Sequence, residues 1–241
     1  QVYSEGADGT ILWNASLVLR NYLQKKESEF RGRRVLELGA GLGHLSVAVS
    51  QMGAHVTSTE ARCKVEEASG DGSNCKCWGC VNQLRRNIGK SLNISQDMAV
   101  NQCYEVGEDS EKKGSIRVVE LQWGAEAKER WGPLKQESET QEDKFDYIIM
   151  SEVIYNQSAD SLYDDDFHDS LIWTILQFVK PGTIIYNVFV DRPFSFMFFA
   201  KIDELPGKPF KVEVVDEKEY DCLLKDDEDA KLYMHRLCYC G

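Results

Sequence analysis

The order of apolar and polar positions along the chain predicts strands and helices that alternate. Short apolar runs typical of buried strands occur at 34–38, 55–60, 116–121, 145–156, 183–190, 211–215 and 231–240. Apolar residues recur at helical spacing in 12–26, 44–52, 81–88, 171–179 and 194–202. Because strands that alternate with helices build parallel sheets, the pattern predicts a doubly wound α/β fold with helices on both faces.

The first two strands and the helix between them predict a ligand site. Gly39, Gly41 and Gly43 follow the first apolar run, and Glu60 ends the second. Glycine has no Cβ, so a ligand can lie directly on the backbone of such a loop. An acid at the tip of the second strand can accept hydrogen bonds from two ribose hydroxyls. The loop is therefore interpreted as a nucleoside pocket, with an ordinary tight strand-to-helix turn as the alternative.

The residues around this loop distinguish between nucleoside cofactors. A dinucleotide fingerprint requires a sixth-position glycine, where this chain has His44. Glu37, at the strand end, suits a ligand that carries an ammonium and a sulfonium group. The string LELGAGLG resembles motif I of the seven-stranded S-adenosylmethionine-dependent methyltransferases. An NAD-dependent oxidoreductase remains the weaker alternative.

Three further strings resemble the protein-lysine methyltransferase branch of that class. Residues 9–15 are similar to its TGxxxWxA pattern, which implies that Trp13 lies against the cofactor end of the pocket. The string ELQWG resembles LxWG, and the ring of Trp123 is expected against the adenine face. Either tryptophan could instead be an ordinary buried aromatic. The element order is also similar, which implies a Rossmann-like sheet of seven strands, mostly parallel, with an antiparallel final strand.

The third string, SEVIY, resembles the DxxY motif, with Glu152 in place of aspartate. Ligands of parallel sheets bind at the carboxyl ends of strands, so Ser151, Glu152 and Tyr155 are expected to face the crevice of the glycine loop. Glu152 is the candidate to orient an incoming lysine amine, and Tyr155 to form a wall of its slot. The longer glutamate leaves the depth of the carboxylate open. A second departure is Val190-Asp191-Arg192, where the family commonly has a more basic string.

Length and composition predict a single domain over residues 1–241, with an N-terminal helix at 12–26. No apolar stretch approaches the roughly eighteen residues of a membrane span, and the first residues do not resemble a signal peptide. We therefore expect a cytoplasmic monomer, with the nucleus as a second location, and no membrane partner.

The net charge of −12 disfavours direct binding of nucleic acid and favours a basic partner. From Ser151 to Ser170 there are only acidic charged residues, which predicts an acidic rim beside the site: Glu152, Asp160, Asp164, Asp165, Asp166 and Asp169. An ordinary acidic helix start explains some of them. The stretches that begin at Glu105 and Glu126 have few apolar residues and are expected to be solvated loops.

A cysteine-rich insertion is predicted at 61–80. Eight cysteines in a chain of this size, with no secretory signal, favour free thiols over disulfides. Four of them offer soft ligands for zinc, although their spacing is not that of paired CxxC motifs: Cys63, Cys75, Cys77 and Cys80. We expect no bound metal, with a zinc site as the alternative.

The resemblance implies an enzyme that transfers a methyl group from S-adenosylmethionine to the side-chain amine of a lysine in a basic or exposed segment of a protein. Two alternatives stay open. One is a catalytically weak scaffold of the same fold, since fold alone does not establish chemistry. The other is a different acceptor, namely histidine, arginine, nucleic acid or a small molecule.

Overall fold

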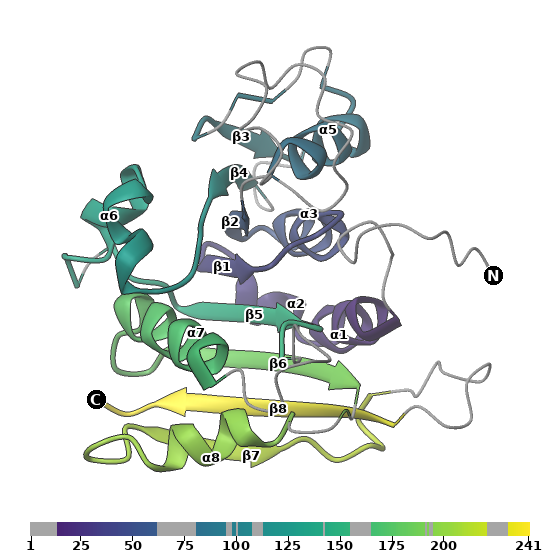
Figure 1. Cartoon of the computed structure of the whole chain (residues 1–241). Helices are drawn as coiled ribbons and strands as arrows, with labels where there is room; N and C mark the ends of the chain where they lie inside the picture. Colours follow the sequence, from purple (N-terminus) through teal and green to yellow (C-terminus); the bar gives the residue numbers. More distant parts are fainter. Residues whose placement is uncertain are drawn as a thin grey trace.

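The computed structural model describes residues 14–61, 81–94, 98–99, 101–107, 113–141, 143–154, 165–190, 192, 195–220 and 231–241. In this part of the chain one sheet has the strand order β3-β4-β2-β1-β5-β6-β8-β7, from top to bottom of Figure 1. The strands are β1 Arg34–Leu38, β2 His55–Glu60, β3 Cys103–Val106, β4 Gly114–Glu120, β5 Tyr147–Ser151, β6 Ile184–Val190, β7 Phe210–Val214 and β8 Leu232–Tyr239. This confirms the predicted α/β class and all seven expected strands, and adds β3.

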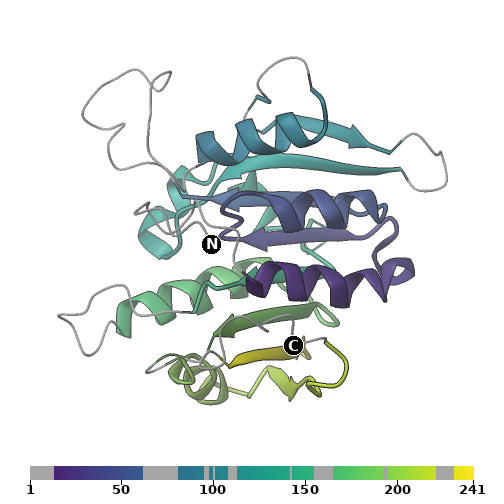
Figure 2. The same cartoon turned by 90° about the vertical axis from the view of Figure 1, so that its right-hand side faces the viewer.

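Helices cover both faces of the sheet, as the alternating pattern predicts. They are α1 Asn14–Gln24, α2 Glu27–Phe30, α3 His44–Gln51, α5 Val81–Ser91, α6 Pro133–Glu137, α7 Asp165–Phe178, α8 Met197–Asp203 and the 3-10 helix η4 Ala125–Arg130. In Figure 1, α1, α3 and α5 lie to the right and α6, α7 and α8 to the left; Figure 2 brings the first group to the front. No described helix is both long and apolar enough to span a membrane.

The centre of the sheet is parallel, and its topology creates the site. β1 pairs in parallel with β2 on one side and with β5 on the other. The chain continues from β1 to β2 and β4 on one side and then crosses to β5 on the other, so the carboxyl ends of β1, β2 and β5 meet at this reversal of strand order. β8 runs antiparallel to both β6 and β7, which confirms the antiparallel final strand.

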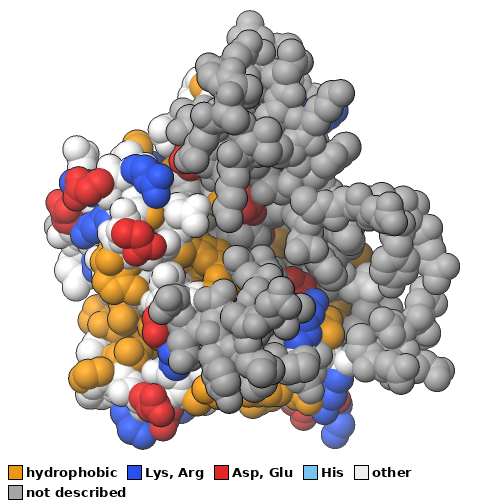
Figure 3. Space-filling model, viewed as in Figure 1, with side chains coloured by type: hydrophobic (Ala, Val, Ile, Leu, Met, Phe, Trp, Pro, Cys, Tyr) orange, Lys and Arg blue, Asp and Glu red, His pale blue; other side chains and the backbone are white. Residues whose placement is uncertain are grey.

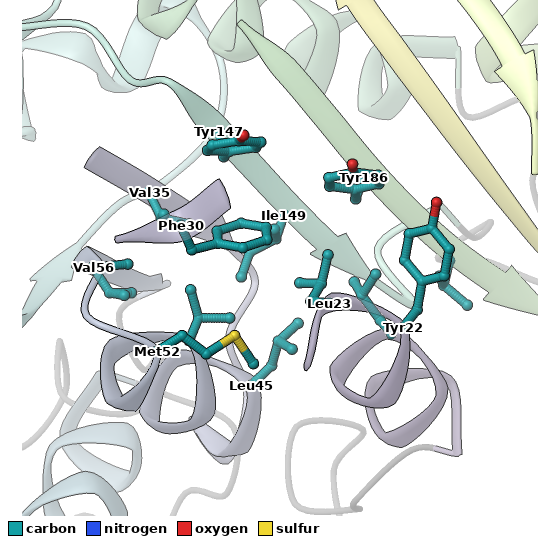
Figure 4. Packing of buried hydrophobic residues seen from close by; sticks show 14 of the residues in the cluster. Tyr22, Leu23, Phe30, Val35, Leu45, Met52, Val56, Tyr147, Ile149 and Tyr186 are labelled. Atoms are coloured by element: carbon teal, nitrogen blue, oxygen red, sulfur yellow. The ribbon is translucent and has the colours of Figure 1, made fainter. Parts of the chain in front are cut away.

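Two hydrophobic clusters hold the helices on the sheet. On the face covered by α1 and α3, Tyr22, Phe30 and Tyr147 pack around the strands, as Figure 4 shows. The Phe30 and Tyr147 ring centroids lie 4.5 Å apart. On the opposite face a second cluster includes Trp131 and Phe178. Buried apolar contacts of this extent fix the strands, and hence the loops at their carboxyl ends.

Two expected solvated loops contain regular structure, so those predictions were wrong. Glu105 lies in β3, which pairs antiparallel with β4. The stretch from Glu126 contains parts of η4 and all of α6, and its Trp131 and Leu134 are buried at 1% and 0% exposure. Two large apolar residues at helical spacing are enough to fix this polar segment on α7. Trp131 Nε1 also donates to the Gln122 carbonyl at 2.8 Å.

Candidate functional site

The loop between β1 and α3 requires glycine for two different reasons. Gly39, Gly41 and Gly43 have φ angles of 69°, 53° and 79°, which side chains rarely adopt. A Cβ on Gly39 would lie 2.7 Å from Val153 Cγ1, in the segment that follows β5. A Cβ on Gly43 would lie 2.7 Å from side-chain atoms of α5. Gly43 therefore permits the packing of α5, whereas Gly39 faces the segment that contains the DxxY-like motif.

Glu60 connects the end of β2 to the glycine loop. Its carboxylate accepts a hydrogen bond from the Gly41 amide at 2.8 Å and from the Ala61 amide at 2.9 Å. Burial raises the pKa of Glu60, and these two amides oppose the rise. A carboxylate has about four acceptor positions, so two remain for a ligand. The arrangement places an acceptor for a diol beside the loop.

Glu37 lies beneath the same loop, at the end of β1. It is 3% exposed, and the Ser46 hydroxyl donates to its carboxylate. Ser46 Oγ lies 2.7 Å from Ser58 Oγ of β2. Burial raises the pKa of Glu37 to about 8, with Glu60 adding to the rise and Ser46 opposing it. A cationic ligand group near Glu37 would favour its ionised form.

Trp123 also lies next to Gly39. Its Cζ2 atom lies 3.6 Å from the position of a Cβ on Gly39. The ring also packs on Phe167 of α7, with centroids 5.4 Å apart. The following amide, of Gly124, donates to Thr174 Oγ1 at 3.0 Å and fixes the turn. A partly exposed indole beside the glycine loop suits stacking with an aromatic base.

Glu152 follows β5 and is turned toward β6. Its backbone has a φ of 57°, unusual for a residue with a side chain, and the residue is 7% exposed. Its Oε1 accepts the Val190 amide at 3.0 Å, and its Oε2 accepts Arg192 Nη1 at 2.6 Å. Burial raises the pKa of Glu152, and Arg192 and the Val190 amide oppose the rise. The carboxylate is therefore already held by the last residue of β6 and by Arg192 beyond it, which the sequence did not indicate.

The structure brings together most of the described residues that the sequence singled out. The loop between β1 and α3 contains Gly39 and Gly41. Around it lie Glu37, Glu60 and Trp123, and the end of β5 packs against it. Ser151, at the end of β5, has a buried hydroxyl without a hydrogen-bond partner among the described residues. Other candidates lie outside the described residues: Trp13, Tyr155, Cys63, Cys75, Cys77 and Cys80.

Several contributions were not foreseen from sequence. Val153 touches the loop, Ser46 contacts Glu37, and Arg192 holds Glu152. Arg192 was noted only as part of a departure from the family string. At the position of the dinucleotide glycine, His44 Nε2 lies 3.0 Å from Arg20 Nη1 of α1.

The described surface charges on the face of α6, α7 and α8 are mixed. Figure 3 shows acidic and basic side chains interspersed with hydrophobic ones there. Of the predicted acidic rim, Asp169 pairs with Lys201 at 2.8 Å, and Glu152 with Arg192. The side chains of Asp160, Asp164, Asp165 and Asp166 lie outside the described set.

Comparison with known proteins shows a similarity to lysine methyltransferases. Residues 3–78 match the model of a family described as lysine methyltransferase. EEF1A lysine methyltransferase 3 of Xenopus tropicalis is 26% identical over 175 residues, which are 73% of this chain and 54% of that protein. Protein-lysine methyltransferase METTL21E of Bos taurus is 24% identical over 216 residues, 85% of this chain and 58% of that protein. The chain is thus similar to lysine methyltransferases, with the family match over residues 3–78.

One solved structure shares its fold with the whole chain. A 16S rRNA N2 G1207 methyltransferase of T. thermophilus, solved with AdoMet and guanosine, superposes with a TM-score of 0.54 at 18% identity. The match covers 100% of this chain and 45% of that one, and at this identity it shows the shared fold. The chain spans between 54% and 62% of the length of three curated relatives, two of which are the Xenopus and Bos taurus proteins.

Proposed function

We propose that this protein is a lysine methyltransferase, which transfers a methyl group from S-adenosylmethionine to the side-chain amine of a lysine in a protein substrate. The observation that carries the proposal is the pair of carboxyls at the glycine loop, Glu60 beside it and Glu37 beneath it. Glu60 suits the ribose diol of a nucleoside cofactor, and Glu37 beneath the loop suits a cationic amino-acid tail, which a dinucleotide lacks.

The described residues fit this cofactor in their donor and acceptor chemistry. Glu60 would hold the ribose hydroxyls with the acceptor positions that Gly41 and Ala61 leave free, and Trp123 would stack on the adenine. Glu37 would pair with the ammonium end, next to the backbone of Gly39. When bound, S-adenosylmethionine supplies a methyl group that its sulfonium activates for in-line displacement.

The protein's own part in the reaction is to align the acceptor amine and to keep it neutral. A lysine amine has a pKa of about 10.4 in water, so it must lose its proton before it attacks. Glu152 supplies a hydrogen-bond acceptor next to the segment that touches Gly39, and Tyr155 is the proposed wall of the slot. Burial of the amine in this crevice favours its neutral form, and alignment lowers the entropic cost of the reaction.

We also propose the partner and the setting. The net charge of −12 favours a substrate lysine in a basic or exposed segment, and we expect no direct binding of nucleic acid. The protein is proposed to act as a monomer in the cytoplasm, with the nucleus as a second location. EEF1A, named in the description of the Xenopus relative, is the first protein to test as a substrate.

The test is transfer of radiolabel from S-adenosylmethionine. The purified protein is incubated with EEF1A in one reaction and with a whole-cell extract in another, and the labelled residue is identified by mass spectrometry. Label on a protein lysine supports the proposal. Label on RNA or on another residue type, or cofactor binding with no label on any acceptor, contradicts it and favours respectively another acceptor or a scaffold.

A further inference from the structure

The Glu152 carboxylate links the end of β5 to the end of β6. The Arg192 guanidinium lies 2.6 Å from Oε2, and the Val190 amide 3.0 Å from Oε1. The Glu152 side chain is 3% exposed, whereas that of Arg192 is 32% exposed. A buried carboxylate is thus paired with a cation that reaches it from the solvent side. Each of its oxygens keeps a further acceptor position.

The backbone places this ion pair beside the cofactor loop. Glu152 has a positive φ of 57°, and its amide donates to the Val188 carbonyl at 2.9 Å. The next residue, Val153, occupies the space beside Gly39. A left-handed conformation at a residue with a side chain costs about 1–3 kcal/mol and is commonly kept at functional sites. The conformation directs the carboxylate to Arg192 while Val153 contacts the loop.

The ion pair has an electrostatic consequence for an acceptor amine. A lone carboxylate next to a lysine stabilises its ammonium form, which cannot attack a methyl group. A carboxylate already paired with a guanidinium presents almost no net charge, yet its free lone pairs still accept an N–H. Among the described residues, Arg192 supplies the charge that opposes the raised pKa of Glu152; the buried His168 of α7 and His235 of β8 are not among the groups that shift it.

We propose that Arg192 is a positioning residue that neutralises Glu152, so that the carboxylate aligns the neutral lysine amine without stabilising the ammonium. The inference rests on the proposed lysine methyltransferase function. Arg192 acts through Glu152, and the amine bonds to the lone pairs of Glu152 that Arg192 and Val190 leave free. The strand-end string Val190-Asp191-Arg192 thereby acquires a role in the reaction.

The variants separate charge balance from structural support. Arg192→Gln removes the compensating charge, Arg192→Lys keeps it, and Glu152→Gln combined with Arg192→Gln restores a neutral pair. Arg34→Gln is the matched control, because Arg34 also pairs with a glutamate, Glu137, at 3.0 Å and is 33% exposed, but it lies at the start of β1. Acceptors are the protein labelled in the extract reaction and Nα-acetyl-lysine N-methylamide.

For Arg192→Gln we expect a lower kcat at pH 7, with KM unchanged or lower, because the unpaired carboxylate binds the unreactive ammonium. Each unit by which the pKa of the bound amine rises lowers the neutral fraction about tenfold. The loss of kcat should shrink as the pH rises toward 9. The double variant should turn over faster than Arg192→Gln alone, and Arg192→Lys should retain most of the activity of the wild type.

Binding gives a readout independent of turnover. Calorimetric titration of Nα-acetyl-lysine N-methylamide, with S-adenosylhomocysteine present, should show tighter binding to Arg192→Gln than to the wild type at pH 7. Weaker binding, a double variant no faster than Arg192→Gln, or the same kcat and KM changes in Arg34→Gln would overturn the inference. Absence of methyl transfer by the wild type would instead overturn the proposed function.

Discussion

The side chain of Val153 fills the space that a Cβ on Gly39 would need, with Cγ1 only 2.7 Å from that position. Gly39 belongs to the proposed cofactor loop, and Val153 follows the proposed acceptor-binding residue Glu152. The two halves of the site are therefore in direct van der Waals contact. A change in one half must be accommodated by the other.

Gly39→Ala should lower the free energy of unfolding by about 1–3 kcal/mol, because it adds a clash to a backbone with positive φ. Guanidinium denaturation measures the loss. Gly182→Ala is the control, since Gly182 has a φ of 91° and no atom within 4 Å of the added Cβ. The double variant Gly39→Ala, Val153→Ala removes the clash, so its loss of unfolding free energy measures the strain of the positive φ alone. An equal loss in Gly39→Ala and Gly182→Ala would show that the Val153 contact has no energetic role.

Glu60→Ala should weaken S-adenosylmethionine binding by about 1.5–3 kcal/mol, the range for hydrogen bonds to charged groups. The variant also removes the acceptor of the Gly41 and Ala61 amides, so its fold is checked by circular dichroism. Isothermal titration calorimetry measures the affinity. Glu213→Ala, on the edge strand β7, should bind as the wild type does. Unchanged affinity in a folded Glu60→Ala protein would remove Glu60 from the site.

Glu37 should make the free protein less stable as the pH rises. Its folded pKa is raised from 4.5 to about 8, so between these values the folded state holds a proton that the unfolded state has lost. The associated destabilisation is absent below pH 4.5, grows through this window and is complete above pH 8. Glu37→Gln removes it, so the melting temperature of the variant relative to the wild type should increase from pH 5 to pH 8. A constant difference would mean that Glu37 titrates normally.

Glu152→Gln should reduce methyl transfer on the order of a hundredfold, because it removes a positioned acceptor and leaves the Arg192 cation uncompensated beside the amine. S-adenosylmethionine should bind nearly as before, because its proposed contacts are the glycine loop, Glu60 and Trp123. Cofactor affinity by calorimetry and turnover on the identified substrate are measured together. If both fall equally, Glu152 contacts the cofactor; if neither falls, the lysine slot lies elsewhere.

Metal analysis of protein prepared without chelator should find no stoichiometric zinc. The four cysteines concerned lack paired CxxC spacing, and ligands of structural zinc sites usually come in such pairs. One zinc per chain, lost on Cys75→Ser with Cys77→Ser, would contradict this prediction. The described residues contain no group of three His, Cys, Asp or Glu side chains that could hold a metal ion.

Local periodicity was enough to predict the seven expected strands and most of the helices. Apolar runs and helical spacings are properties of neighbouring residues, so they can be recognised without knowledge of the tertiary fold. The same pattern missed β3 and α6. β3 forms by pairing with β4 and not through strong apolar alternation of its own, and α6 is held by Trp131 and Leu134 within a polar stretch.

The sequence by itself determined the glycine loop, the acids Glu37 and Glu60, and the position of Trp123 after a strand, because each follows from residue type next to a predicted element. Only the tertiary structure decided that Val153 meets Gly39 and that Arg192, 40 residues beyond Glu152, pairs with it. Such contacts depend on strand order and on the direction of single side chains. Neither is encoded in local spacing, since the pairing of distant strands is fixed by burial over the whole sheet.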